Sequence, residues 1–266
     1  MSGSISPVAA TGPIFSNSVP THSHSIAAPV VIEAFGFPLG ATGADDLHLL
    51  DRVERARAGR FHFDLHRQRY IAAHATVRRL LGERLGLAPA DVPISRTPLG
   101  KPILGTLSDG EGSSSPPAAL HFNLTHCEDL GWLAMGPVPV GIDVERIREL
   151  EDLLPLIQSH CTADEIDTLI ALPQEEMAAA FLRIWTRKEA VLKAWGTGIG
   201  EIELHSLHVG LGGERVYPGR DPKRFVPLQV TTRECHGAIL SIAVVADSPP
   251  EFILKAGAGP ISASSA

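Results

Sequence analysis

The chain has 266 residues, of which 44% are hydrophobic, and a formal net charge of −7. This length and composition allow one large globular domain, or two small ones, with a sizeable buried core. The acidic balance argues against a nucleic-acid binder, and no apolar run approaches the roughly 20 residues that span a bilayer.

Both ends of the chain have the composition of disordered segments. Residues 1–28 are mainly small and polar residues with Pro, which cannot bury enough apolar surface to offset the entropy of ordering. Residues 255–266 are predicted to be a flexible tail for the same reason, and residues 108–117 a flexible loop. No Lys or Arg precedes Arg52, so a signal or transit peptide is not expected, and we predict a cytoplasmic protein.

The first half of the folded region, residues 29–137, is expected to alternate between short strands and helices. The expected elements lie at residues 30–35, 45–58, 65–85, 92–104, 120–124 and 131–135. The helix at 65–85 is indicated by apolar residues that recur at spacings of three and four, and Gly86 ends it. Pro and Gly residues divide the segment 92–104 into two short strands joined by a turn.

The second half, residues 138–254, repeats this rhythm. Its expected elements are a long helix at 174–194 and strands at residues 138–147, 204–209, 226–231 and 238–245. Two halves that each combine a long helix with several short antiparallel strands predict an α+β fold with pseudo-two-fold symmetry, in which each long helix packs on a small sheet. The cleft between the halves is the expected ligand site.

The segment at residues 140–147 alternates strictly between apolar and polar residues. In a strand, Ile142 and Val144 would enter the core, while Asp143 and Glu145 would project together from the opposite face. Two neighbouring carboxylates repel each other unless a cation neutralises them, and paired oxygen ligands suit Mg²⁺ or Mn²⁺. An exposed edge strand with acidic residues is the structural alternative, and this segment alone does not exclude it.

A second polar cluster lies near the end of the expected long helix. Glu189 and Lys193 are four residues apart and share one helical face, and Trp185 precedes Glu189 by one turn. In isolation this pattern is typical of an ordinary surface ion pair beside a core tryptophan. Its combination with the acidic strand is what favours a functional site.

Taken together, Gly-Ile-Asp-x-Glu at 141–145 and Trp-Thr-Arg-Lys-Glu-Ala-x-x-Lys at 185–193 resemble the signature of the Sfp-type 4'-phosphopantetheinyl transferases. The resemblance extends to Gly-Lys-Pro at 100–102, Phe-Asn-Leu-Thr-His at 122–126 and Arg-Phe at 60–61. It covers most of residues 50–245. The family fold is a pair of α+β halves related by a pseudo-two-fold axis, with coenzyme A and a metal ion in the cleft, in agreement with the organisation predicted above.

The resemblance implies that Asp143, Glu145 and Glu189 are metal ligands and that Lys193 lies near the pyrophosphate and the attacking group. Attack of a serine hydroxyl on the β-phosphorus of coenzyme A expels 3',5'-ADP and spreads negative charge over the pyrophosphate. A metal ion and Lys193 would meet that charge. Glu189 is the candidate base for the serine proton, directly or through a metal-bound water, and the sequence leaves that choice open.

The resemblance also assigns a set of residues to coenzyme A binding, which are Arg57, Arg69, Lys101, Pro102, Thr125, His126 and Lys188. Among these, Arg57 matches a cation for the 3'-phosphate, and Thr125 and His126 match a pair that contacts coenzyme A phosphates. Lys101 and Pro102 match a loop beside the adenosine portion. Arg57 belongs to an arginine-rich stretch that can bind phosphate in bidentate fashion, formed by Arg52, Arg55, Arg57 and Arg60.

Three alternative functions involve residues in or next to these motifs. A metal-dependent pyrophosphohydrolase acting on coenzyme A or nucleotides would use the acidic cluster with water as the nucleophile. A catalytically silent carrier-binding protein is disfavoured because all the acidic residues and Lys193 are present. His126 and Cys127 could suggest a cysteine nucleophile with its base, but neighbouring residues on a strand face opposite ways.

We therefore expect a Mg²⁺-dependent transferase that uses coenzyme A as co-substrate and acts on apo acyl, peptidyl or aryl carrier proteins. Both halves of the expected site lie on one chain, which predicts a monomer. Neither nucleic acid nor membrane is an expected partner. The identity of the carrier stays open among fatty-acid, polyketide, non-ribosomal peptide and lysine-pathway proteins, as does tolerance for acyl-coenzyme A.

Overall fold

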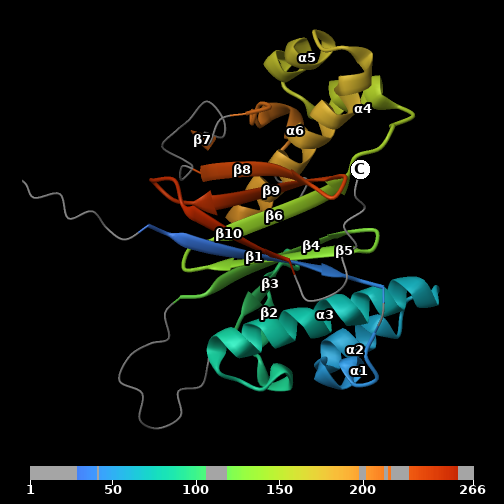
Figure 1. The fold of residues 1–266 in the computed structure, drawn as a ribbon, viewed down its shortest axis with the longest axis vertical. Coiled ribbons are helices and arrows are strands. Elements are labelled where there is room, and N and C mark those ends of the chain that lie inside the picture. The colour runs from blue at the N-terminus through green and yellow to red at the C-terminus, as the bar shows by residue number, and fades with distance from the viewer. Residues whose placement is uncertain are drawn as a thin grey trace, which may run out of the picture.

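The computed structural model describes residues 29–40, 42–105, 119–197, 202–212, 215–216 and 228–256. The tail predicted at residues 1–28, the loop predicted at 108–117, and all but the first two residues of the tail predicted at 255–266 lie outside these ranges. The described chain folds into a stack of helix, sheet, sheet and helix (Figure 1). In this part of the chain, no helix is long and apolar enough to cross a membrane.

The first sheet and its long helix form one side of this stack. In the order in which they pair, the strands are β10 (Glu251–Ala256), β1 (Val31–Pro38), β5 (Leu130–Gly136) and β4 (His121–Cys127). The helix α3 (Asp64–Leu85) covers the outer face, where Val77 and Leu81 pack in one core cluster with Phe37 and Leu133. As predicted, α3 stops at Gly86, whose left-handed φ of 69° is a conformation that glycine adopts without strain.

The second sheet and its helices form the other side. In pairing order, its antiparallel strands are β6 (Val140–Arg146), β9 (Ala238–Val245), β8 (Leu228–Cys235) and β7 (Arg215–Val216). The long helix α6 (Gln174–Trp195) packs on its outer face, and α4 (Leu153–His160) and α5 (Ala163–Ile170) pack against α6 farther from the sheet (Figure 1). The inner faces of the two sheets share one apolar cluster, in which Ile32 and Trp132 of the first sheet join Ile142 and Leu240 of the second.

The strand β6 follows the predicted alternation. Ile142 and Val144 are buried between the sheets, whereas Asp143 faces α6, where it contacts Lys193. Gly141 explains how α6 can lie so close to this strand, because a Cβ atom at position 141 would overlap the carbonyl oxygen of Ala190. The fold therefore brings the acidic strand and the polar face of α6 together, as the two motifs require.

The remaining elements correct two expectations. The helix predicted at 45–58 is two helices, α1 (Asp46–Leu49) and α2 (Arg52–Ala58), because Asp51 caps the second one reciprocally with Glu54. The strand predicted at 204–209 is instead a 3₁₀ turn, η2 (Leu204–Ser206), followed by extended chain. The hairpin predicted at 92–104 is present as β2 (Ile94–Arg96) and β3 (Pro102–Leu104), preceded by the 3₁₀ turn η1 (Pro89–Asp91).

The C-terminal strand departs from the predicted division at residues 138–254 and 255–266. β10 continues to Ala256, past the predicted end of the folded chain, and it pairs in parallel with β1 of the first sheet. Lys255 Nζ lies 2.5 Å from Glu33 Oε1 on β1. The α+β architecture of two sheet–helix halves is confirmed, but its last strand belongs to the sheet of the opposite half.

Candidate active site

A pocket of about 300 Å³ opens between the two halves. One wall is formed by Lys101 in the turn between β2 and β3, by Pro102 at the start of β3, and by Asn123 on β4. The other wall is the end of α6, with Glu189 and Lys193. Lys101 and Pro102 of the first half and Glu189 and Lys193 of the second therefore line one cavity, whereas Asp143, Glu145, Thr125 and His126 are not among its lining residues.

Asp143 and Lys193 form an ion pair at this cleft. Lys193 Nζ donates to Asp143 Oδ1 at 2.6 Å and to the carbonyl oxygen of Ile142 at 3.2 Å. Thr125 Oγ1 donates to the same Asp143 oxygen at 3.1 Å. The predicted metal ligand and the predicted catalytic lysine are thus in direct contact, and β4 contributes a hydroxyl to them.

Two carboxylate oxygens at the site are buried without a hydrogen-bond partner among the described residues. They are Asp143 Oδ2 and Glu189 Oε1. Glu145 has partners: its Oε2 lies 3.1 Å from Arg148 Nη1 and accepts from Cys127 Sγ at 3.7 Å. A buried polar atom with no partner is costly in a native protein, so the two unpaired oxygens point to a ligand.

The electrostatics of the two buried carboxylates reflect their crowding. Burial raises the pKa of Asp143, although its ion pair with Lys193 acts in the opposite direction. Burial also raises the pKa of Glu189; Lys193 lowers it, and the charges of Asp143 and Glu145 add to the increase. All three carboxylates therefore act on one another, and a cation would relieve their repulsion.

The donor set fits a hard divalent cation in its chemistry. Asp143 and Glu189 each offer an unpaired carboxylate oxygen, and oxygen ligands suit Mg²⁺. Over the ranges given above, however, no three or more His, Cys, Asp and Glu side chains are arranged to hold a metal ion. The third predicted ligand, Glu145, has a side chain that is 26% exposed and forms an ion pair with Arg148 instead of pointing towards Asp143 and Glu189.

Two side chains of the first half hold β6 in place beside the cleft. Asn123 Oδ1 accepts a hydrogen bond from the backbone amide of Ile142 at 2.9 Å, and this amide lies on the edge of β6 that β9 does not cover. Lys101 Nζ donates to the carbonyl oxygens of Val140 and Lys193. Burial and the nearby charge of Lys193 lower the pKa of Lys101 to about 8. Lys101 therefore joins the two halves as well as lining the pocket.

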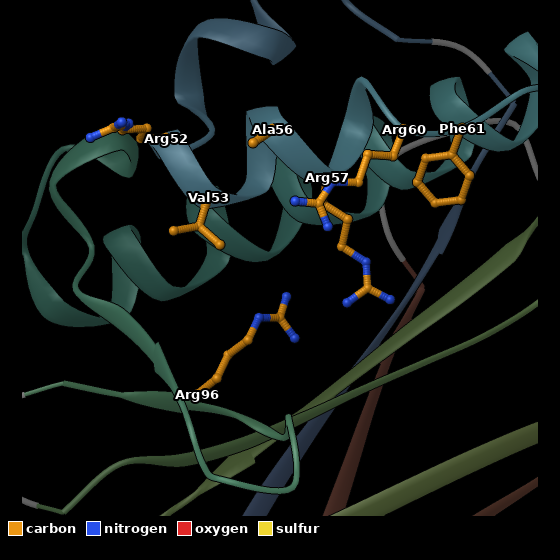
Figure 2. Close-up of a pocket in the computed structure, with 7 residues that line it drawn as sticks. All are labelled: Arg52, Val53, Ala56, Arg57, Arg60, Phe61 and Arg96. Atoms are coloured by element: carbon orange, nitrogen blue, oxygen red, sulfur yellow. The ribbon is translucent and has the colours of Figure 1, made fainter.

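A larger pocket of about 680 Å³ lies next to the β2–β3 hairpin and is lined mainly by arginines. Figure 2 shows Arg96 of β2 and Arg57 of α2 pointing towards the same space from opposite walls. Arg52 and Arg60 complete the cationic part of the lining, Phe61 adds an aromatic ring, and no carboxylate is among the lining residues. Such a pocket is suited to a phosphate group, which guanidinium donors bind in bidentate fashion.

The other predicted coenzyme A residues differ in their surroundings. His126 is exposed on β4, and desolvation together with the cations Lys193, His74 and Arg69 lowers its pKa. Arg69 is partly buried, and its Nε has no hydrogen-bond partner in the described chain. Both side chains are therefore placed among cations beside the site, with donors that an anionic ligand could use.

Lys188 was predicted to bind coenzyme A, and the structure contradicts this. Its side chain is fully buried on α6, where Nζ lies 2.6 Å from Glu165 Oε2. Nζ also donates to the carbonyl oxygens of His160 and Leu204. These partners saturate the ammonium group on the side of α6 that faces α4 and α5, so Lys188 has a structural role.

Two residues of the site, Arg96 and Asn123, are not indicated by the sequence patterns. Arg96 lies in no quoted motif, although its place five residues before Lys101 brings it to the other side of the same turn. Asn123 was part of a motif but received no role, because its bond to Ile142 crosses between two strands that are not paired in a ladder. Only the tertiary arrangement reveals that contact.

The two-half α+β fold places carboxylates and a lysine at the cleft and a separate arginine-lined pocket beside the β2–β3 hairpin, a combination suited in its chemistry to a polyanion and a cation. Two family models match this chain. Residues 41–137 match the model of the 4'-phosphopantetheinyl transferase N-terminal region, and residues 139–236 match that of the 4'-phosphopantetheinyl transferase superfamily. The chain belongs to this superfamily.

Several curated phosphopantetheinyl transferases are similar to this chain. It is 39% identical over 155 residues to 4'-phosphopantetheinyl transferase HetI of Nostoc sp., which covers 58% of this chain and 62% of that protein. It is 30% identical over 146 residues to 4'-phosphopantetheinyl transferase psf-1 of Bacillus pumilus, covering 55% and 58%. The human L-aminoadipate-semialdehyde dehydrogenase-phosphopantetheinyl transferase is 28% identical over 172 residues, covering 60% and 54%. The chain thus matches less than two thirds of the length of each relative.

Proposed function

We propose that this protein transfers the 4'-phosphopantetheine group of coenzyme A to a serine of an apo carrier protein and releases 3',5'-ADP. The observation that carries the proposal is the pair of unpaired carboxylate oxygens on Asp143 and Glu189, next to Lys193. These residues lie in the segment that matches the superfamily model. An acidic pair beside a lysine at a cleft is what a metal-assisted phosphoryl transfer needs.

The proposed metal ligands are Asp143 and Glu189, with Glu145 as the third carboxylate of the cluster. A bound Mg²⁺ ion would neutralise charge on the pyrophosphate oxygens of coenzyme A. The chain itself supplies donors to the same oxygens. Lys193 Nζ sits at the cleft, where it donates to Asp143 Oδ1 and to the carbonyl oxygen of Ile142, and a pyrophosphate oxygen would be a further acceptor; the ring N–H of His126 on β4 would be a second donor.

Glu189 is the proposed general base. Its Oε1 is the oxygen proposed to hold the metal ion, so its other carboxylate oxygen would take the serine proton. The serine proton passes to Glu189 as the serine oxygen bonds to the β-phosphorus. The bond from the β-phosphorus to the bridging oxygen breaks, and the electron pair leaves with 3',5'-ADP.

The arginine-lined pocket is the proposed site of the 3'-phosphate. Arg57 and Arg96 face each other across it, and the hairpin turn that carries Lys101 separates it from the cleft. Lys101 and Pro102 would lie beside the adenosine portion. A monomeric state, a cytoplasmic location and a carrier protein as the acceptor stay part of this proposal.

The proposal is tested by incubating the protein with coenzyme A, Mg²⁺ and an apo carrier protein, and measuring the mass of the carrier. One phosphopantetheine should be added, and a carrier with serine replaced by alanine should gain nothing. Release of 3',5'-ADP without any carrier would instead identify a pyrophosphohydrolase. The variant Lys193→Ala should lose carrier loading. Lys255→Ala is its matched control and should keep loading, because Lys255 also forms an ion pair, with Glu33, but lies on the edge strand β10.

A further inference from the structure

The arginine-lined pocket raises a question of stability. Guanidinium groups approach it from two separate walls, α2 and β2, and like charges repel each other when no anion is bound. α2 has only seven residues, so it cannot hold its position by its own hydrogen bonds. Something behind the pocket has to fix both walls.

A single buried arginine contacts the wall formed by α2. Arg78 on α3 is 1% exposed. Its Nε donates to Glu54 Oε2 at 2.7 Å, and its Nη2 donates to Asp51 Oδ2 at 2.8 Å. Asp51 caps α2 and Glu54 lies in its first turn, so both carboxylates face α3 while Arg52 and Arg57 of the same helix line the pocket.

The same guanidinium contacts the chain that leads into the other wall. Arg78 Nη1 donates to the carbonyl oxygen of Val92 at 3.0 Å and to that of Pro89 at 3.3 Å. Val92 lies two residues before Ile94, the first residue of β2, which ends at Arg96. One planar group therefore connects the helix that carries Arg57 to the strand that carries Arg96.

Glu54, one of the two carboxylates that bind Arg78, is itself held by several hydrogen bonds. Glu54 is 2% exposed, and besides Arg78 it contacts His74 Nδ1 at 2.9 Å and accepts from the backbone amide of Asp51 at 3.0 Å. A lysine could not replace Arg78, because the fixed fork of the guanidinium is what reaches two carboxylates and a carbonyl oxygen at once.

We propose that Arg78 is a positioning residue that sets the distance between Arg57 and Arg96, and so the affinity of the pocket for a phosphate group. The inference rests on the proposed function, in which this phosphate is the 3'-phosphate of coenzyme A. It predicts a defect specific to ligands that carry that phosphate, whereas a purely structural role of Arg78 would weaken all ligands alike.

Asp51→Asn is the most selective variant. Asn can still cap α2 through its side-chain oxygen, as Asp51 Oδ1 does for the amide of Glu54 at 2.8 Å, but its amide nitrogen cannot accept from Arg78. Arg78→Lys keeps the charge and removes the fork. Asp64→Asn is the control, since Asp64 is also at a helix start but its side chain is 84% exposed, 3.9 Å from Arg67.

Calorimetry with 3',5'-ADP and with 5'-AMP tests the proposal without turnover. We expect Asp51→Asn and Arg78→Lys to weaken 3',5'-ADP binding by about tenfold, with 5'-AMP and the Asp64→Asn control changed less than about twofold. Equal losses for both nucleotides, or no loss, would overturn the proposal. If Arg78→Lys does not fold, Asp51→Asn decides. A wild-type protein that binds 3',5'-ADP but loads no carrier would refute the proposed function, and the nucleotide-binding comparison would still test the role of Arg78.

Discussion

Replacing Glu54 with Gln keeps the size of the side chain and removes its charge from a buried site. The pKa of Glu54 is lowered from 4.5 to about 2: burial opposes this shift, but the hydrogen bond and charge of His74 and the hydrogen bond from Arg78 outweigh it. At about 1.4 kcal/mol per pH unit, this difference corresponds to roughly 3 kcal/mol of unfolding free energy at neutral pH. That is a large share of the 5–15 kcal/mol that stabilises a typical domain.

The sign of the pH dependence follows from the direction of the shift. Because the folded-state pKa lies below the unfolded value, the stabilisation is complete above pH 4.5 and is lost as the pH falls towards about 2. Urea unfolding of the parent and Glu54→Gln should therefore differ by about 3 kcal/mol at pH 7 and by progressively less below pH 4.5. The pH-dependent difference isolates Glu54 from the other titrating groups.

Glu234→Gln is the matched control for this experiment. Glu234 pairs with Arg183 at 2.5 Å, but its side chain is 57% exposed, so the loss should stay within about 0.5 kcal/mol. A difference between the parent and Glu54→Gln that stays constant from pH 7 to pH 3, or that is no larger than the control, would refute the assigned ion pair.

Three further variants test the site and its support. Lys193→Ala should keep the fold and slow carrier loading by about 10²-fold or more in a single-turnover assay, because its ammonium group matters most as charge develops on the pyrophosphate; unchanged turnover would exclude the role. Asp143→Asn should abolish loading and, in EDTA, melt no lower than the parent, since burial disfavours the charged Asp143; only the parent should gain stability from Mg²⁺ and coenzyme A. Gly141→Ala should lower the melting temperature strongly, because its Cβ would overlap the backbone of α6; a normal melting curve would contradict this close packing.

The acidic strand and the helix that carries Glu189 and Lys193 were predictable because their signals are local. The period of two in β6 assigns Ile142 and Asp143 to opposite faces, and the spacing of four puts Glu189 and Lys193 on one face of α6. Such patterns depend on chain geometry alone. For that reason the composition of the cleft was accessible from the sequence.

Contacts between distant segments were not predictable in the same way. Lys188 is next to Glu189 in the motif, yet the 3.6-residue period turns it by about 100° to another face of α6, where it contacts Glu165. The break between α1 and α2 at Asp51 depends on the reciprocal cap with Glu54, which a polar and apolar pattern does not encode. Arg96 needs the folded hairpin before it can face Arg57.

The place of β10 in the first sheet has a consequence for how the chain folds during synthesis. The edge of β1 that receives β10 cannot be covered until residues 251–256 have emerged, some 220 residues after Val31. Contacts of such long sequence separation form slowly, because a large loop must close first. Until then an N-terminal fragment would present an open strand edge, which is a template for aggregation. The last strand thus makes the two halves one cooperative unit despite their internal symmetry.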